Sequence, residues 1–401
     1  MNIKQCLVNF PQKLFTINKF ALFCYSFSHF FAKIILYTIK QGKSMLFIKK
    51  VLLGVFVLAL FAGSSFASST KKELVTLENF IKADSTRAYL KELAFNANKV
   101  NFIRSTRERT DTDNQDVIRM NDDTLYSRII LDVKGGATIS LKKYAGFQNV
   151  NVLDIRHSQI ASLTGEGTIK VDESMLTEGE HVYVIIRTGL LRALPTAEMM
   201  QRAYKAQDGI SITYHSSNQF VPSVDYDYAT LDTVKYKIFE RFAKNPQKYL
   251  VRNGFGKVGE RDEPSAQTMI AIGWGGLSGK QAVYSPFSGK GEREVFTIDR
   301  PNLKFKEGAF FSFTMYNENG WIATKNYAIN SDDMIANADG TYTIVFLASG
   351  EPIKKGDLNV VRTPRGKMWT GVLRAYHPVE KIESYNWADN WTKKMTAQFM
   401  K

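Results

Sequence analysis

The chain has 401 residues, of which 44% are hydrophobic and 23% are charged, with 53 Lys and Arg against 39 Asp and Glu. This composition is typical of folded proteins and excludes a largely disordered or low-complexity chain. Since a domain averages about 150 residues, the length predicts two or three domains, each with its own core.

A secretory signal peptide is predicted over 45–67. It has a basic start, an apolar run over 51–62 and a small-x-small cleavage site over 65–67. We expect cleavage between Ala67 and Ser68. The run is shorter than the roughly 20 residues of a membrane-spanning helix, so we expect no permanent membrane anchor after cleavage. The predicted location is periplasmic or secreted.

Residues 1–44 precede this signal, and we interpret them as a mis-assigned upstream extension. They contain both cysteines, so the mature chain has none, which excludes disulfides and thiolate chemistry. Residues 1–67 carry eight Lys and no acidic residue, so their removal lowers the formal charge from +14 to +6. The remaining basic residues are dispersed, and we therefore expect no nucleic-acid partner.

The pattern over 68–115 predicts a helical lead-in, because apolar residues recur at three- and four-residue steps, with a break near Asp84-Ser85. Residues 116–225 then form a first β domain. Lys134-Gly135-Gly136 supplies the positive φ of a tight hairpin. The strands expected here are 125–133, 137–141, 147–156, 167–171 and 181–187.

One helical pattern begins at Pro195, and another covers Thr230–Leu250. Residues 226–264 are predicted to be a helical connector. A second β domain is predicted over 265–392, with turns at 317–320 and 363–366. Its expected strands are 294–299, 309–316, 321–328, 341–347, 358–362 and 367–376.

In the second domain, Phe311, Phe313 and Met315 alternate with Ser312, Thr314 and Tyr316, which is typical of a half-buried strand. The fold class that accounts for these patterns is mainly β. It consists of two antiparallel β-sandwich or jelly-roll-like domains with a helical lead-in and a helical connector.

Two parts of the chain resemble known bacterial families. Val117–Ser127, which reads VIRMNDDTLYS, resembles the signature of domain of unknown function 1254. Phe310–Tyr316, Asn337–Gly340 and Leu373–Pro378 resemble its usual partner, domain of unknown function 1214. The resemblance implies tandem β-rich domains in proteins that are often exported, and it brings no established reaction.

The glycine-rich motifs do not predict a cofactor site. Gly254–Gly259 has the spacing of a dinucleotide-binding loop, but a helix rather than a strand precedes it, so we interpret it as a loop at a helix end. Gly273–Lys280 lacks the Ser or Thr of a phosphate loop and is predicted to be a close-packed loop, with Trp274 covering a cavity. The histidines of the mature chain are isolated, so we expect no metal site.

The richest polar cluster lies just before and within the first long strand. There Arg119 and Asp123 are candidates for holding a ligand, and Tyr126 for donating a hydrogen bond to it; turn capping and ion pairing are the alternative interpretation. The complete set of candidate ligand-binding residues is Arg119, Asn121, Asp123, Tyr126, Trp274, Tyr316, Arg374 and Tyr376.

The weak catalytic candidates are Asp122, Asp123 and His157. His157 follows a strand end, where an exposed and inert side chain is expected. His377 is expected to be a structural cap. No sequence motif specifies a reaction, so whether the protein is an enzyme stays open.

The first functional hypothesis is an exported envelope protein that binds a small-molecule or glycan-like ligand in a cleft of, or between, the two β domains. One alternative is an exported hydrolase that uses Asp and His as acid and base. The other is a structural or oligomer-forming envelope protein, whose aromatic residues would all be buried. A homo-oligomer is left open.

Overall fold

The computed structural model describes residues 72–113, 115, 118–245 and 254–379. The predicted signal peptide over 45–67, its cleavage site at Ala67-Ser68 and the extension over 1–44 lie outside the described residues, as does the end of the second predicted domain. Among the described residues, no helix combines the length and the apolar composition that a membrane crossing requires.

The first β domain is built from two sheets that share one hydrophobic core. The five-stranded sheet is antiparallel throughout, in the order β2 (Arg104–Ser105), β3 (Thr124–Asp132), β8 (His181–Gly189), β5 (Gln148–Leu153) and β6 (Gln159–Thr164). The three-stranded sheet has the order β7 (Gly167–Val171), β4 (Ala137–Leu141) and β9 (Ser211–Tyr214). Alternate residues of both sheets, such as Ile129 and Ile139, point into the shared core.

The predicted hairpin between β3 and β4 is wrong, although its turn is present. Gly135 and Gly136 have φ of 72° and 96°, and the Gly136 N–H donates to the Val133 carbonyl at 2.9 Å. However, β4 pairs with β7 and β9 and not with β3. Because residues of both strands pack into the same core, the turn carries the chain from one layer of the sandwich to the other.

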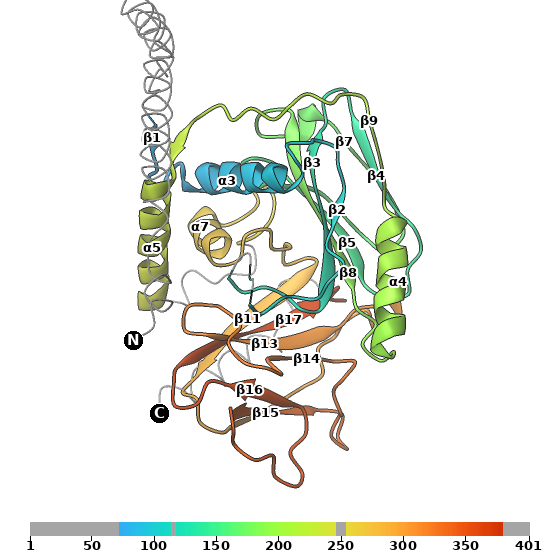
Figure 1. Ribbon diagram of the computed structural model, residues 1–401, viewed down its shortest axis with the longest axis vertical. Coiled ribbons are helices and arrows are strands. Elements are labelled where there is room, and N and C mark those ends of the chain that lie inside the picture. Colours follow the sequence, from blue (N-terminus) through green and yellow to red (C-terminus); the bar gives the residue numbers. More distant parts are fainter. Residues whose placement is uncertain (1–71, 114, 116–117, 246–253, 380–401) are drawn as a thin grey trace, which may run out of the picture. The chain divides into compact units, whose positions relative to one another are not determined.

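Three helices pack together beside this sandwich: α3 (Phe80–Phe95), α5 (Tyr228–Lys244) and α7 (Glu263–Ile272) (Figure 1). The sequence did not indicate α7, which begins with an Asp262 cap that accepts from the Ser265 N–H at 2.8 Å. The predicted break at Asp84-Ser85 is wrong, since α3 runs through it with both side chains buried. A fourth helix, α4 (Thr196–Asp208), packs against Leu125 and Leu190 of the first domain.

The second β domain repeats the two-layer plan. Its four-stranded sheet is antiparallel, in the order β11 (Ala282–Gly289), β17 (Trp369–Tyr376), β13 (Phe311–Asn317) and β14 (Ala328–Asn330). The facing sheet has the order β12 (Glu294–Ile298), β15 (Tyr342–Ala348) and β16 (Val360–Thr363). In contrast to the expected antiparallel arrangement, β15 and β16 are parallel.

The remaining elements are short. A parallel pair joins β1 (Glu73–Leu74) to β10 (Tyr226–Asp227), and two 3₁₀ turns, η3 (Glu173–Met175) and η4 (Phe305–Glu307), lie between strands. Of the strand expected over 321–328, only Ala328 belongs to a strand. The mainly β fold with several antiparallel sheets and a few helices is confirmed.

Strand β13 shows how the two halves of the structure meet. Phe311, Phe313 and Met315 point into the second core, as the alternation predicts. The strand is not half-buried, however, because its other face is covered as well: Ser312 donates to Asp123, and the Tyr316 hydroxyl donates to the Met120 carbonyl at 2.8 Å. The outward face of this sheet therefore contacts the first half of the chain.

Candidate functional site

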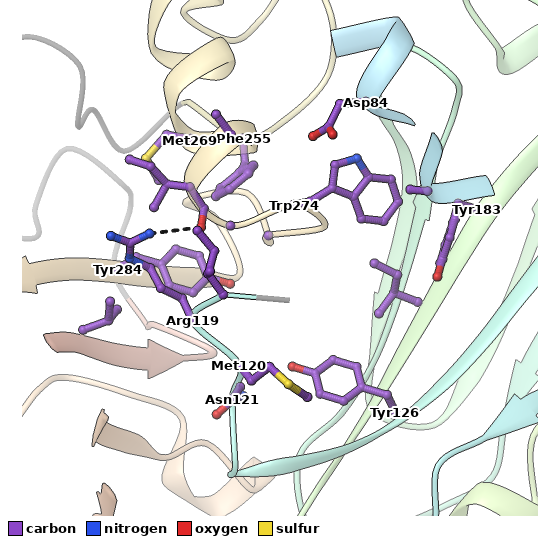
Figure 2. Close-up of a pocket in the computed structure, with 18 of the residues that line it drawn as sticks. Asp84, Arg119, Met120, Asn121, Tyr126, Tyr183, Phe255, Met269, Trp274 and Tyr284 are labelled. Atoms are coloured by element: carbon purple, nitrogen blue, oxygen red, sulfur yellow. Dashed lines mark hydrogen bonds between the residues drawn. The ribbon is translucent and has the colours of Figure 1, made fainter. Parts of the chain in front are cut away.

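A cavity of about 680 Å³ lies between these outward sheet faces and the three packed helices. Helices α3, α5 and α7 contribute to its wall, and so do β3 and β8 of the first domain and β11 and β17 of the second. Figure 2 shows Arg119, Tyr126 and Trp274 approaching it from three separate segments. A cavity of this volume is in the range that holds a small organic ligand.

Much of the wall is apolar or aromatic. Helix α5 contributes Phe239 and Phe242, and α7 contributes Met269, Ala271 and Ile272. The other large apolar lining residues are Phe95, Ile118, Met120, Ile185, Phe255, Trp274, Trp321 and Val372.

The loop after α7 is close-packed and holds Trp274 against the cavity. A Cβ at Gly275 would overlap Ile185, and one at Gly276 would overlap the Phe255 ring. The indole of Trp274 packs edge-on against Tyr183, with 4.8 Å between ring centroids. Packing against these rings fixes the indole as part of the cavity wall.

The indole N–H of Trp274 is buried and has no hydrogen-bond partner among the described residues. The nitrogen lies on the side of the ring that faces Asp84 (Figure 2). Asp84 Oδ2 is also buried without a hydrogen bond, although Lys235 Nζ lies 3.6 Å away. This end of the cavity therefore offers an unused donor and an unused acceptor.

Cationic side chains outnumber carboxylates around the cavity. The cationic residues are Arg87, Lys91, Arg104, Arg119, Arg128, Arg187, Lys235 and Arg374, and the acidic residues are Asp84, Glu92 and Asp232.

Each of the three carboxylates is paired with a cationic side chain from a helix or from β2. Glu92 accepts two hydrogen bonds from Arg104, at 2.7 and 2.6 Å, and a third from the Tyr183 hydroxyl at 3.0 Å. Arg87 bridges the other two carboxylates, at 2.7 Å from Asp84 and 2.6 Å from Asp232. No carboxylate lining the cavity remains for the arginines of the sheet faces.

Arg119, Arg187 and Arg374 accordingly form no ion pair among the described residues. Arg374, 5% exposed, donates to Thr314 Oγ1 at 3.1 Å and to the Tyr316 hydroxyl at 2.8 Å. We call these three residues the arginine cluster.

Arg187 is the member of the arginine cluster with an unused donor. It is also 5% exposed, and its Nη2 donates to the Gly275 carbonyl at 2.6 Å. Its Nη1 is buried and has no hydrogen-bond partner among the described residues. A buried guanidinium with neither a counter-ion nor a full set of acceptors is costly, so this position is suited to an acceptor from outside the chain.

The positive potential of the cluster is visible in its neighbours. Burial alone would raise the pKa of Tyr126, but Arg187, a side-chain hydrogen bond with Thr124 and, to a smaller extent, Arg374 and Arg128 together outweigh burial and lower it below the usual value. Burial and, to a smaller extent, Arg374 lower the pKa of Arg119, against the opposing influence of Tyr316. The cavity therefore favours negative charge near Tyr126.

Six of the eight candidate ligand-binding residues line this cavity: Arg119, Asn121, Tyr126, Trp274, Arg374 and Tyr376. Asn121 Nδ2 donates to the Tyr376 hydroxyl at 3.0 Å, which joins the two β domains. The other two candidates, Asp123 and Tyr316, lie behind the wall.

Asp123 is 1% exposed and serves as an acceptor between the two domains. It accepts from Ser312 Oγ and, at 3.0 Å, from Asn330 Nδ2, and Arg192 lies 3.9 Å away. Asp122 faces elsewhere: it pairs with Arg109 and Arg192 at a second cavity of about 500 Å³. Both carboxylates are thus occupied by partners of the fold.

His157 is buried rather than exposed, contrary to expectation. It is 1% exposed, and its Nε2 accepts from the Gly275 N–H at 2.9 Å. Burial, helped by Arg261, lowers its pKa to about 3, so the ring is neutral and supports the Trp274 loop. His377 directly follows the end of β17, and its Nε2 lies 3.6 Å from Glu307.

Among the described residues, no group of three or more His, Cys, Asp or Glu side chains could hold a metal ion. The glycine motif at 254–259 lies in a loop before α7, where Phe255 is buried against the cavity.

Sequence reasoning missed Arg187 and the helical wall. The available signal was the alternation of β8, where Val182, Val184 and Ile186 point into the first core. Arg187 lies on the opposite face of β8. A cation in an otherwise apolar strand therefore indicated that this second face is covered by other parts of the chain and is charged.

Comparison with known proteins gives a family model and structural neighbours. Residues 289–380 match the model described as a protein of unknown function, DUF1214. No curated protein matches the chain. The resemblance of the N-terminal half to domain of unknown function 1254 stays a prediction.

The fold is similar to that of the VPA0106 protein from Vibrio parahaemolyticus, known from a crystal structure. The TM-score is 0.55 and the sequence identity 15%, over 77% of this chain and 94% of that one. An uncharacterised protein from Burkholderia cenocepacia gives a TM-score of 0.48 and 12% identity, over 76% of this chain and 84% of that one. At such identities the first match shows a common fold alone.

Proposed function

We propose that this chain is an exported envelope protein that binds a small organic molecule in the cavity between its two β domains. The single observation that carries the proposal is a cavity of about 680 Å³ whose wall combines aromatic side chains with unpartnered polar atoms. Ligand pockets have this character: mostly apolar surface, with a few polar groups that set the orientation of the ligand.

The distribution of the aromatic residues favours binding over a purely structural role. Trp369 is fully buried in the second core, and Tyr316 is fully buried in a smaller cluster on the other face of the same sheet, as a structural role would require. Trp274 and Trp321, in contrast, line the cavity, and Trp321 is 37% exposed.

Nothing in the described residues favours the hydrolase alternative over binding. Asp123 is engaged with Ser312 and Asn330, Asp122 with Arg109 and Arg192, and the neutral His157 with the Gly275 N–H. We therefore propose no reaction.

The test is the binding of a neutral apolar probe to the full chain. The dye N-phenylnaphthylamine is expected to bind saturably, with its fluorescence rising as it leaves water. Ala88→Phe places a ring in the cavity from α3 and is expected to weaken dye binding at least about tenfold, or about 1.4 kcal/mol. Ala197→Phe, on the exposed face of α4, is the matched control and should leave binding unchanged. Equal binding by both variants would place the dye elsewhere and refute the proposal.

A further inference from the structure

The charges around the cavity identify the class of ligand more closely than the shape of the cavity does. The carboxylates of Asp84, Glu92 and Asp232 are each paired with a cation. All of these ion pairs lie on the side of the cavity that the helices and β2 form. On the sheet side, the arginine cluster of Arg119, Arg187 and Arg374 has no carboxylate partner among the described residues. The buried donor that lacks both a counter-ion and an acceptor therefore lies on the sheet side, at Arg187.

Beside Arg187, the cavity is also lined by Tyr126, whose hydroxyl can donate a hydrogen bond to a small charged group. Tyr126 lies on β3, next to Arg187 on the neighbouring strand β8, and the Arg187 guanidinium carbon is 5.7 Å from the centre of the Tyr126 ring. Arg187 Nη1 is buried without a hydrogen-bond partner. A guanidinium in this state forms its strongest bonds with a planar oxyanion, which it can contact through two parallel N–H groups.

The opposite wall limits what may be attached to that oxyanion. Phe239, Phe242, Met269 and Ile272 present hydrocarbon from α5 and α7. A sugar would bury its hydroxyl groups against this surface without partners, and a neutral ligand would leave the arginine cluster uncompensated. A ligand with many charges would place some of them against hydrocarbon.

We infer that the cavity takes an amphiphilic organic acid, with its carboxylate at Arg187 beside Tyr126 and its apolar body against α5 and α7. This inference rests on the proposed function and adds the chemical class of the ligand. The carboxylate supplies the counter-charge that the arginine cluster lacks, and the apolar body displaces water from the aromatic wall.

The experiment compares two probes with the same apolar body and different heads, decanoate and decanol, by calorimetric titration of the full chain at neutral pH. Decanoate is expected to bind at least about tenfold more tightly, since a hydrogen bond to a charged group contributes about 1.5–3 kcal/mol. Equal affinity for the two probes would overturn the carboxylate inference and leave the proposed function standing. Binding of neither probe would overturn the inference alone if N-phenylnaphthylamine still binds, and would overturn the proposed function as well if the dye also fails to bind.

Variants locate the carboxylate. Arg187→Gln keeps a donor for the Gly275 carbonyl and is expected to weaken decanoate binding about tenfold or more while leaving decanol within twofold. Arg202→Gln, on the surface of α4, is the matched control and should change neither affinity. If Arg187→Gln lowers both affinities equally, the carboxylate position is wrong. Should that variant fail to fold by circular dichroism, Arg187→Lys takes its place: it keeps the charge but loses the paired N–H groups, and it is expected to weaken decanoate binding more than decanol binding.

Discussion

Replacing Asp123 separates a structural role from a catalytic one. Its carboxylate is buried and accepts from Ser312 and Asn330, with Arg192 3.9 Å away. Asp123→Ala leaves these groups without their acceptor, and removing one partner of a buried charged network costs about 3–5 kcal/mol. Asp123→Asn keeps the shape: its amide oxygen still accepts from Asn330, and the Ser312 hydroxyl can rotate to accept. We expect a smaller loss of about 1–2 kcal/mol from the missing charge.

Urea unfolding followed by circular dichroism measures both losses, and N-phenylnaphthylamine binding to the folded variants measures the cavity. We expect the stability to fall in the order wild type, Asp123→Asn, Asp123→Ala, with dye affinity of the folded protein unchanged, because Asp123 does not line the cavity. The reasoning is refuted if Asp123→Asn unfolds like the wild type and yet loses dye binding. That result would show that Asp123 takes part in binding.

Two further predictions concern the Trp274 loop. The pKa of His157 is lowered to about 3 in the folded protein, against about 6.5 for an ordinary histidine, so only the unfolded chain binds this proton between those values. The stability due to the neutral ring therefore falls by about 1.4 kcal/mol per pH unit below 6.5. The unfolding free energies of wild type and His157→Asn, measured at pH 7 and pH 5, should therefore converge by about 2 kcal/mol; parallel curves would contradict it. Gly276→Ala should lower the unfolding free energy by about 1–3 kcal/mol through overlap with Phe255. Gly273→Ala is the control, because its Cβ would meet the Met269 carbonyl oxygen at an ordinary 3.9 Å; an equal loss in this variant would exclude overlap as the cause.

Strands with strong alternation and glycine turns could be predicted from the sequence, and strands without them could not. The expected strand over 137–141 matches β4, since its apolar residues alternate and a glycine pair precedes it. Strand β11 was missed because Pro286 interrupts it, and proline is tolerated there because β11 is at the edge of its sheet. Strand β6 is also an edge strand, half-buried along its whole length, so it has no apolar and polar alternation to detect.

The expected strand over 321–328 failed for a different reason. It follows a clear Asn-Gly turn, but the backbone of Ile322 is bound by a side chain rather than by a neighbouring strand. Gln115 accepts from the Ile322 N–H at 2.9 Å and donates to its carbonyl at 2.9 Å. A contact between residues 207 positions apart decides the local conformation, and no local pattern contains that information.

The candidate site shows the same division. Arg119, Asn121 and Tyr126 were found because polar residues gather in one stretch of sequence, and the structure places all three at the cavity. The neighbouring Asp123 has the same local signal but points to Ser312 and Asn330 instead. Local composition identified the segment, whereas which side chain faces the cavity depends on partners from the second domain.

The location of the cavity follows from how the two sandwiches use their sheets. Each sandwich buries one face of its larger sheet in its own core, which leaves the faces that carry Arg187 and Arg374 to be covered by other parts of the chain. The bonds between Asn121 and Tyr376 and from Arg374 to the Arg119 carbonyl, at 3.0 and 2.9 Å, join these faces directly. Because these hydrogen bonds within the fold hold both walls in place, the walls of the site are formed by folding itself.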